Sequence, residues 1–483
     1  MSSVKEILAV LPKLTEKEHA LIEKAASVAA KAHEGEKRKS GEPYVNHVLE
    51  TGKTLAELKM DAETIAAGIL HDTLEEGKIT AAEIKKEFGD TILFLVSGVS
   101  KLGKLKYHGV ERHVESLRKL FVAMAHDIRV IIIKLADRLH NIKTLEYVQK
   151  EKRARIALET LMIHARIADR LGMGRLKAEL EDGAFPYVYP EAYKEVKKII
   201  ASEESAHLDR LKKISRSIEK DVAASGVKIV SASYRIKHLY SLWRKLEKKE
   251  HDVNKIHDII ALRMIVPSIE DCYRALGAIH GNYQPLPGRI KDYIALPKLN
   301  GYRSLHTTIF TGDGGVLEIQ IRTKEMHEEA EYGIASHLAY KEFAKKTDKK
   351  VIEEKISWTK ELLEWQKEAA QAEEFLKHLK VDFFESRVFA FTPKGDAVDL
   401  PLGATAIDFA YAIHSDIGDH MAGSKINGKL VPLETDLKQG DIVEIVTKES
   451  ARPKLKWMES AKTSLAKRHI HSYLEKNKER VRR

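Results

Sequence analysis

Apolar residues recur at three- and four-residue intervals through the first 195 positions of this 483-residue chain. The segments TEKEHALIEKAASVAAKAH, DAETIAAGILHDTLEE and HVESLRKLFVAMAHDIRVIIIKLADRLHNIKTL all show this spacing, and Thr or Asp stands near several of their starts. Such spacing places apolar side chains on one face of a helix, and Thr and Asp are common N-caps. The pattern therefore predicts an all-α first domain.

The pattern changes after Gly226. The segments VKIVSASYRI, IIALRMIV, SLHTTIF and GVLEIQIRT are typical of β-strands, and helical stretches separate them, which predicts an α+β domain. A charged helical stretch follows, and RVFAFTPKGDAVDLPLGATAIDFAYAIH then opens a small β-rich domain that ends near DIVEIVT. The predicted parts are 1–195 (all-α), 196–345 (α+β), 346–385 (helical linker), 386–448 (small β-rich domain) and 449–483 (basic helical tail).

Composition places the chain among ordinary globular proteins. It is 43% hydrophobic and 32% charged, and apolar runs such as VIIIKLA are too short to span a membrane. The N-terminal segment lacks the pattern of a secretory signal. The single cysteine, Cys272, excludes an internal disulfide framework and favours a reducing compartment. We therefore expect a cytoplasmic protein without membrane association.

The net charge of +10 is concentrated at the C-terminal end. From Ala451 to Arg483 there are eleven Lys or Arg and three Glu, a net of +8, so the remainder carries only about +2. A basic tail favours polyanions, RNA above all. The alternative interpretation, a solvated helix face, fits the same residues equally well.

The stretch ILHDTLEE carries His71 and Asp72, each followed four positions later by Glu75 or Glu76. On a continuous helix each pair would share one side. His47 and Asp137 lie in two further helical segments, RKSGEPYVNH and LADRLHN.

A histidine on an apolar helix face is usually a packed or capped residue. Unpaired carboxylates among the apolar neighbours of GILHD and IKLAD would be costly, however, and a shared divalent cation would offset that cost. Two imidazoles and two carboxylates suit manganese, iron or zinc, and a metal with open positions would lower the pKa of a bound water.

A second group of polar residues lies in the α+β region. In GVLEIQIRT, strand alternation puts Glu318, Gln320 and Arg322 on one face, and Asp258 precedes another apolar strand. Two carboxylates from neighbouring strands would suit Mg²⁺ on nucleotide phosphates, although a solvated sheet surface explains the same alternation. Candidate phosphate- and base-binding residues nearby are Arg289, Lys291, Lys298, Asn300, Tyr302 and His306, with Arg235, Lys237, His238, Ser241 and Lys245 upstream.

The order H…HD…D resembles the HD-type phosphohydrolases. RKSGEPYVNH, HDTLEE and KLADRLHNIKTL resemble, more specifically, the hydrolase domain of the RelA/SpoT family, whose enzymes make and degrade the alarmone (p)ppGpp. The resemblance implies hydrolysis of the 3′-pyrophosphate to give GDP or GTP. This chain has Glu76 where the family usually has Asp, which would move the carboxylate. The implied roles are Mn²⁺ binding by His47, His71, Asp72 and Asp137, activation of water by Glu75 and Glu76, phosphate binding by Arg38 and Lys39, and nucleoside binding by Asn141.

KDYIALPKLNGY and LEIQIRT resemble the synthetase domain of the same family, whose fold is similar to nucleotidyltransferases. The implied reaction moves the β,γ-pyrophosphate of ATP to the 3′-hydroxyl of GDP or GTP. Tyr234 and Arg303 depart from the family pattern, which usually has Gly and Gln there. The implied roles are Mg²⁺ binding by Asp258 and Glu318, with Glu318 also the base; guanine stacking by Tyr302 beside Asn300 and His306; and ATP binding by Arg235, Lys237, Ser241, Lys245 and Arg263.

The region 386–448 resembles a TGS domain, a β-grasp module that contacts the tRNA acceptor end in long family members, with His414 as the candidate contact. The resemblance as a whole predicts a bifunctional enzyme of the stringent response that uses ATP, GDP or GTP and (p)ppGpp, with tRNA and the ribosome as further partners. Two alternatives remain open at this point. One is an enzyme with a single live site, most plausibly the hydrolase, and the other is a tRNA- or ribosome-binding regulator with inactive catalytic domains.

Overall fold

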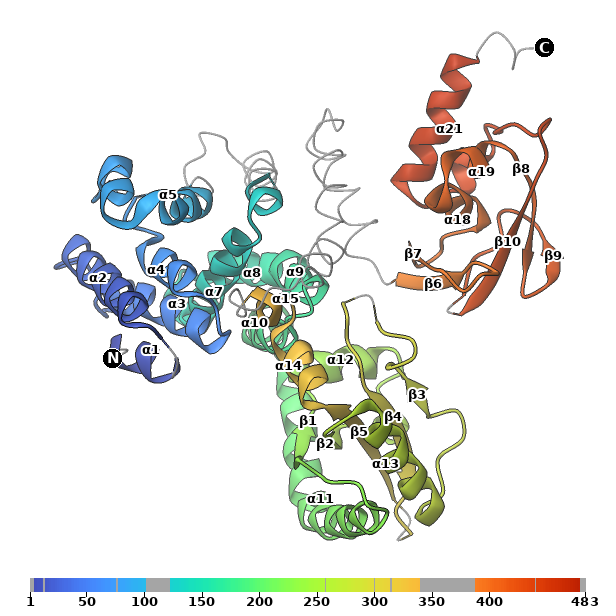
Figure 1. Cartoon of the computed structure of the whole chain (residues 1–483), viewed down its shortest axis with the longest axis horizontal. Helices are drawn as coiled ribbons and strands as arrows, with labels where there is room; N and C mark the ends of the chain where they lie inside the picture. Colours follow the sequence, from blue (N-terminus) through green and yellow to red (C-terminus); the bar gives the residue numbers. More distant parts are fainter. Residues whose placement is uncertain are drawn as a thin grey trace. The chain divides into compact units, whose positions relative to one another are not determined.

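The computed structural model describes residues 4–11, 14–74, 77–100, 122–256, 258–298, 300–312, 315–338, 387–438 and 440–477. These residues belong to two compact units, one ending at 338 and one beginning at 387 in the part described (Figure 1). The helical linker predicted over 346–385 lies outside the described residues.

The first part of the first unit is helical, as predicted. Its apolar faces are buried, and Ile65, Leu70, Ile132 and Leu135 have no exposed surface. The long helix α11 runs through position 195, where the sequence predicts a domain boundary. The elements are α1 (Val4–Ala9), α2 (Glu16–Ala32), α3 (Val45–Glu57), α4 (Ala62–Leu70), α5 (Ala81–Ser100), α7 (Arg129–Lys143), α8 (Lys150–Glu159), the π-helical segment Thr160–His164, α9 (Ala165–Arg170), α10 (Gly174–Val188) and α11 (Pro190–Ala224).

One local prediction is wrong. The segment ILHDTLEE does not continue as a single helix, because α4 ends at Leu70 and positions 71–74 form turns. The Leu70 carbonyl accepts hydrogen bonds from the backbone N and the hydroxyl of Thr73, at 3.1 and 2.7 Å. A threonine hydroxyl that competes for a helical carbonyl in this way favours a turn over another helical residue.

A mixed five-stranded sheet follows, in the order β1-β2-β5-β4-β3, with only the β2–β5 pair parallel. The apolar alternate residues Leu317, Ile319 and Ile321 of β5 are fully buried in the core with α13. This is the predicted α+β domain, and its first strand begins later than the apolar pattern indicates. The elements are β1 (Ser231–Ile236), α12 (Leu239–Glu247), β2 (Ile260–Val266), α13 (Ile269–Asn282), β3 (Lys291–Asp292), β4 (Leu305–Phe310), β5 (Val316–Thr323), α14 (Lys324–Tyr332) and α15 (Ile334–Leu338).

The second unit has a five-stranded sheet, β7-β6-β10-β8-β9, with a parallel β10–β6 pair and helix α18 against it, the predicted β-grasp arrangement. The described part of the basic tail, residues 449–477, folds onto this unit. Trp457 and Ile470 pack with Tyr411 of α18, and the buried Asp408 accepts hydrogen bonds from the backbone of Lys462 and Thr463. The elements are β6 (Arg387–Phe391), β7 (Ala397–Pro401), α18 (Ala406–Ile413), α19 (Ser415–Asp419), β8 (Met421–Ile426), β9 (Lys429–Val431), β10 (Asp441–Thr447), α20 (Trp457–Ser460) and α21 (Ser464–Lys476).

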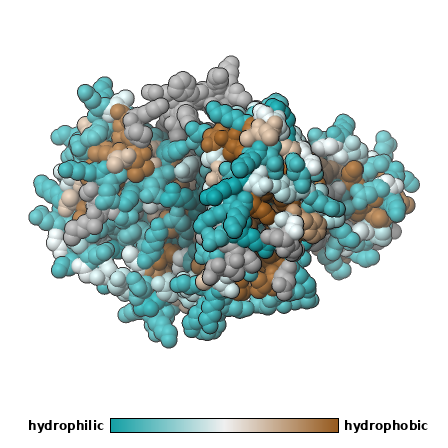
Figure 2. Space-filling view, turned by 90° about the horizontal axis from the view of Figure 1, so that it is seen from below, coloured by the Kyte–Doolittle hydropathy of each residue, from teal (hydrophilic) through white to brown (hydrophobic). Residues whose placement is uncertain are grey.

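The face of the molecule in Figure 2 is mostly hydrophilic, with hydrophobic side chains in small separate groups. Within the described ranges, no helix has both the length and the apolar character needed to cross a membrane.

Candidate active sites

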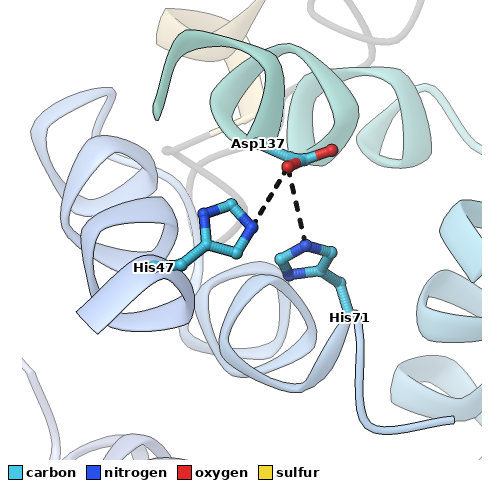
Figure 3. Close-up of side chains that lie close together, drawn as sticks. All are labelled: His47, His71 and Asp137. Atoms are coloured by element: carbon cyan, nitrogen blue, oxygen red, sulfur yellow. Dashed lines mark ion pairs between the residues drawn. The ribbon is translucent and has the colours of Figure 1, made fainter. Parts of the chain in front are cut away.

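Helix α3, the turn after α4 and helix α7 bring the first predicted group of residues together (Figure 3). The Nε2 atoms of His47 and His71 lie 3.3 and 3.8 Å from Oδ1 of Asp137. Asp72 completes the group, with Oδ2 lying 3.5 Å from His47 Nε2 and 3.2 Å from His71 Nε2. The two histidines and Asp137 are at most 4% exposed, so these polar groups are enclosed by protein.

The hydrogen bonds of the two histidines fix which ring nitrogen faces the carboxylates. His71 Nδ1 donates to the Gly68 carbonyl at 2.7 Å, which leaves its buried Nε2 without a hydrogen-bond partner. His140 Nδ1 accepts from the Arg38 guanidinium at 3.0 Å, so His47 Nδ1 must donate to that same atom at 2.8 Å. Both imidazoles in their neutral form therefore present an Nε2 lone pair toward Asp72 and Asp137.

The electrostatics of the group also favour a cation between these atoms. Burial by itself lowers the pKa of His71, but the carboxylates of Asp72 and Asp137 outweigh it and raise the pKa to about 9. Burial raises the pKa of Asp137, yet Lys134 and the two histidines hold it well below its usual range. Lone pairs that face lone pairs repel unless a positive charge lies between them, so the arrangement fits a divalent cation held by two nitrogens and carboxylate oxygens.

Neighbouring side chains orient these four. Tyr44 donates its hydroxyl to Asp72 at 2.9 Å, and Lys134 donates to Asp137 at 2.8 Å. Asn141 donates to Asp137 at 2.6 Å and accepts from Arg38 at 2.6 Å. It therefore bridges the Asp137 carboxylate to Arg38, a side chain predicted to bind phosphate. Of the other predicted residues, Lys39 is exposed, and Glu75 and Glu76 lie outside the described residues.

The second predicted group lines one large cavity of about 1,000 Å³ in the α+β region. Every residue predicted for that region borders it: Arg235, Lys237, His238, Ser241, Lys245, Asp258, Arg263, Arg289, Lys291, Lys298, Asn300, Tyr302, His306 and Glu318. The polar face of β5 is covered rather than solvated, because Gln320 and Arg322 are only 3% and 1% exposed. The solvated-surface interpretation is therefore wrong for this strand.

Asp258 and Glu318 reach the cavity from neighbouring parts of the sheet, because Asp258 precedes β2 and Glu318 lies in β5, which runs parallel to β2. Oδ2 of Asp258 accepts from Lys237 and Lys245, and its buried Oδ1 has no partner. Burial raises the pKa of Asp258, but the two lysines outweigh it and lower the pKa to about 2. An ionised carboxylate with an unpartnered oxygen beside lysines fits a hard divalent cation on phosphate.

Glu318 is held ionised by its neighbours. Burial raises its pKa, but His306, whose Nδ1 lies 3.2 Å from Oε1, outweighs this and lowers the pKa. Tyr302 donates its hydroxyl to the other ring nitrogen of His306 at 2.7 Å. Lys298 lies over the rings of Tyr293 and Tyr302, at 4.6 and 4.8 Å from their centroids. The cavity thus combines a base, aromatic faces and cations.

Sequence reasoning missed several cavity residues. Strand alternation assigns Arg322 only to a polar face, but the Nε and Nη2 atoms of its buried guanidinium have no hydrogen-bond partner and it borders the cavity. Burial lowers the pKa of Arg322 to about 10. The alternation in IQIRT, which puts Arg322 on the same face as Glu318, was the signal that could have placed Arg322 in the cavity. Residues of α9 and α10, among them Asp169 and Lys177, also border the cavity, and no local pattern could have indicated this.

The two departures from the family pattern lie in different places. Tyr234 is in the edge strand β1, pairs with Leu262 and borders the cavity. Arg303 does not border the cavity itself, but it donates to Glu329 of α14 at 3.0 Å, and Glu329 does border it.

In the second unit, His414 lies between α18 and α19. It is exposed, and its Nδ1 accepts from the backbone N of Asp416 at 3.2 Å, which caps α19. This contact gives His414 a structural role as the N-cap of α19.

Three family models match consecutive parts of the chain: an HD domain over 25–174, a region found in RelA/SpoT proteins over 234–345, and a TGS domain over 388–447.

Three curated relatives match nearly the whole chain. Guanosine-3′,5′-bis(diphosphate) 3′-pyrophosphohydrolase of Aquifex aeolicus is 46% identical over 94% of this chain and 64% of its own length. GTP pyrophosphokinase of Streptomyces coelicolor is 42% identical over 95% of this chain and 56% of its own. Bifunctional (p)ppGpp synthase/hydrolase SpoT of Escherichia coli is 42% identical over 94% of this chain and 64% of its own. The chain therefore spans only 56–64% of the length of these relatives. With its three domains in this order, the chain belongs to the RelA/SpoT family.

Proposed function

We propose that the chain is a bifunctional alarmone enzyme, which makes (p)ppGpp at the α+β cavity and hydrolyses it at the helical cluster, in the stringent response. The observation that carries the proposal is that two chemically different sites occur in one unit. One is a small buried set of His and Asp, and the other is a cavity of about 1,000 Å³ whose lining includes Asp258, Glu318 and many cations. Of the named relatives, one is a GTP pyrophosphokinase, one is a pyrophosphohydrolase, and one is named for both synthesis and hydrolysis of (p)ppGpp.

For hydrolysis, His47, His71, Asp72 and Asp137 would hold Mn²⁺, which supplies a water of lowered pKa when bound. The water oxygen forms a bond to the phosphorus on the 3′-oxygen, and the bond from that phosphorus to the 3′-oxygen breaks. Pyrophosphate leaves and the 3′-hydroxyl regains a proton. Arg38 and Lys39 would bind the phosphates, and Glu75 and Glu76 would position the water or take its proton.

Arg38 has a further part in this proposal. Because Asn141 and His140 both accept from its guanidinium, Arg38 is tied to the groups that orient Asp137 and His47. Asn141 is accordingly proposed to fix the geometry of the carboxylate as well as to lie near the nucleoside.

For synthesis, Asp258 and Glu318 would hold Mg²⁺, which neutralises phosphate charge when bound. The 3′-hydroxyl oxygen of GDP or GTP bonds to the β-phosphorus of ATP, the bond from that phosphorus to the α,β-bridging oxygen breaks, and AMP leaves. Glu318 takes the hydroxyl proton, for which its lowered pKa keeps it ionised. Lysines beside Asp258 and the cations Arg235 and Arg263 would bind ATP, and Tyr302 would stack on guanine.

The same proposal assigns 1–195 to the hydrolase, 196–345 to the synthetase, 346–385 to a linker, 386–448 to the TGS domain and 449–483 to a basic tail. A cytoplasmic location is part of the proposal, because the substrates are nucleotides. The test is to incubate the purified chain with ATP, GDP and Mg²⁺, and separately with ppGpp and Mn²⁺, and to separate products by chromatography. Formation of both products supports the proposal, and formation of a single product supports an enzyme with one live site. The absence of both products rejects the proposal.

We further propose that the second unit binds tRNA. The tail from Ala451 to Arg483 carries eleven cations, and α21 packs against the unit rather than hanging free. Because truncation would expose Tyr411 and Met421, the test should neutralise charge instead, with Lys454, Lys467 and Lys476 changed to Gln. We expect tRNA affinity to fall and its salt dependence to become shallower, with the slope decreasing by about 1 for each phosphate that is no longer bound. Unchanged, salt-insensitive affinity would reject tRNA binding by this surface.

A further inference from the structure

One residue outside the α+β region touches the loop that carries the predicted guanine-binding residues. Asp169 lies in α9, within the segment that matches the HD domain model. Its Oδ1 accepts from Asn300 Nδ2 at 3.3 Å and forms an ion pair with Lys177 of α10 at 3.0 Å. Asp169 and Asn300 are 131 positions apart in sequence. The loop is therefore tied to a helix that belongs to the hydrolytic part of the chain.

The backbones are close enough for this short side chain to reach. Gly172, in the turn between α9 and α10, has a φ of +72°, and a Cβ there would lie 2.6 Å from the carbonyl oxygen of Asn300. The same turn accepts a backbone hydrogen bond at 2.9 Å, from Ile334 N to Leu171 O. Helix α10 also packs against α12 and against α14, near the middle of Figure 1. The contact is thus a closely fitted part of the fold.

From Asn300 a continuous series of hydrogen bonds leads to the predicted base. Asn300 Oδ1 accepts from Tyr302 N at 3.2 Å, and the Tyr302 hydroxyl donates to His306 Nε2 at 2.7 Å. His306 Nδ1 in turn lies 3.2 Å from Glu318 Oε1. Since an ionised Glu318 can only accept, His306 Nδ1 must donate, and its Nε2 is then free to accept from Tyr302. Every hydrogen bond in the series therefore has a matched donor and acceptor, with Tyr302 donating in both directions, from its N–H to Asn300 and from its hydroxyl to His306.

We propose that Asp169 is a positioning residue for the synthetase reaction, which orients the Asn300 amide and thereby the binding surface for the guanosine nucleotide. This inference rests on the proposed function. An amide has a donor end and an acceptor end. With Nδ2 held by Asp169, Oδ1 faces the Tyr302 N–H. Without Asp169 the amide can rotate, and Nδ2 would then face that N–H as a second donor. The loop would no longer have the interaction that fixes Tyr302 and the groups beyond it.

The proposal predicts different effects of Asp169 on the two substrates, GDP and ATP. Asp169 touches the loop predicted to bind guanosine nucleotide, whereas Lys237, Lys245 and Arg263, predicted for ATP, lie just after β1, on α12 and on β2. Asp169→Ala should raise the KM for GDP about tenfold and leave the KM for ATP within about twofold. Asp169→Asn retains an oxygen that can accept from Asn300 but loses the ion pair with Lys177, so it should restore most of the GDP affinity.

The experiment measures synthesis kinetics, GDP dissociation constants by calorimetry and ppGpp hydrolysis for the wild-type chain, Asp169→Ala, Asp169→Asn and a matched control. The control is Asp209→Ala, which removes an exposed carboxylate paired with Lys212 on α11. Normal hydrolysis by Asp169→Ala shows that the variant folds. A GDP effect that Asp169→Asn reverses supports the proposal. An unchanged GDP constant, or an equal rise in the KM for ATP, overturns it. A wild-type chain that binds GDP without making alarmone would instead defeat the proposed function, and the binding constants would still decide the role of Asp169.

Discussion

The cluster of His47, His71, Asp72 and Asp137 in the helical region and the cavity in the α+β region differ in how many parts of the chain contribute their side chains. The cluster gathers its side chains from α3, α7 and one turn, and His47, His71 and Asp137 offer ligand atoms all within 4.8 Å of one another. The cavity draws on a sheet, a loop, and helices α9, α10, α12 and α14, over residues from Arg166 to Glu331. A site for one ion can be specified by a few buried neighbours, whereas a site for two nucleotides depends on how distant elements are held.

The difference has a consequence for single substitutions. In the cluster, each side chain faces the place where the ion would lie, so removing one should act directly on the chemistry. In the cavity, charge is shared among many cations, and some residues act only by holding others in place. We therefore expect all-or-none effects in the first site and graded, substrate-selective effects in the second.

The largest effect is expected for Asp72→Asn. It removes a negative ligand from the cluster while keeping the side chain's size, so ppGpp hydrolysis should fall by roughly several thousand-fold, and synthesis should be unchanged. Removing divalent ions with EDTA should also stop hydrolysis, and Mn²⁺ should restore it in the wild-type chain alone.

Asp90→Asn is the matched control, because Asp90 is an exposed residue of α5 whose carboxylate pairs with Lys85 at 2.8 Å. It should hydrolyse ppGpp normally. Normal hydrolysis by Asp72→Asn itself would contradict the metal assignment and remove the first half of the comparison.

The second prediction concerns the base of the synthetase. Glu318→Gln removes a proton acceptor and an anionic ligand without changing shape, so pyrophosphate transfer should fall about 1,000-fold while hydrolysis remains measurable. His306 would then face an amide in place of a carboxylate. Rapid sampling of radiolabelled ATP would follow the transfer. If Glu318→Gln synthesises at the wild-type rate, another group is the base.

The sequence predicted the two sites to different extents, and the reason is physical. The order His47, His71-Asp72, Asp137 could be recognised because each residue interrupts an apolar helical pattern, a local signal. The side chains of β5 could be assigned to faces by alternation, but only the structure shows that Gln320 and Arg322 are buried. The contact of Asp169 with Asn300 leaves no trace in periodicity, because it joins a helix and a loop far apart in sequence.

Tyr302 offers a test within the cavity. Tyr302→Ala should weaken guanosine-nucleotide binding by about 1–3 kcal/mol if the ring stacks on the base. Tyr302→Phe keeps the ring but loses the hydroxyl that His306 accepts, so it should bind nearly normally and transfer pyrophosphate more slowly. Calorimetry with GDP and steady-state kinetics separate the two functions of the side chain. Equal losses in both variants would mean that the hydroxyl, rather than the aromatic face, holds the nucleotide.

The smallest effect is expected at the contact between helices α10 and α12, where a side chain of α10 caps the start of α12. Asp182 of α10 accepts hydrogen bonds from the backbone N of Tyr240 at 2.9 Å and of Leu239 at 3.3 Å, and α12 has no side-chain cap from His238. Loss of such a cap costs about 1 kcal/mol. Because α12 carries Lys245, Asp182→Ala should raise the KM for ATP by a few-fold, the change in affinity that about 1 kcal/mol corresponds to. The KM for GDP should be unchanged.

Ser268→Ala is the matched control for this last test. Ser268 caps α13 by accepting from Asp271 N at 3.1 Å, and among the described residues no part of α13 borders the cavity. Both variants should lower the melting temperature by a similar amount, but only Asp182→Ala should change the KM for ATP. If the two variants alter kinetics equally, the loss reflects general destabilisation, and α10 does not position the ATP side. A rise in the KM for ATP in Asp182→Ala alone would mean that Asp182 positions the ATP-binding residues, as Asp169 is proposed to position those for the guanosine nucleotide. The neighbouring helices α9 and α10 would then each position the residues that bind one substrate.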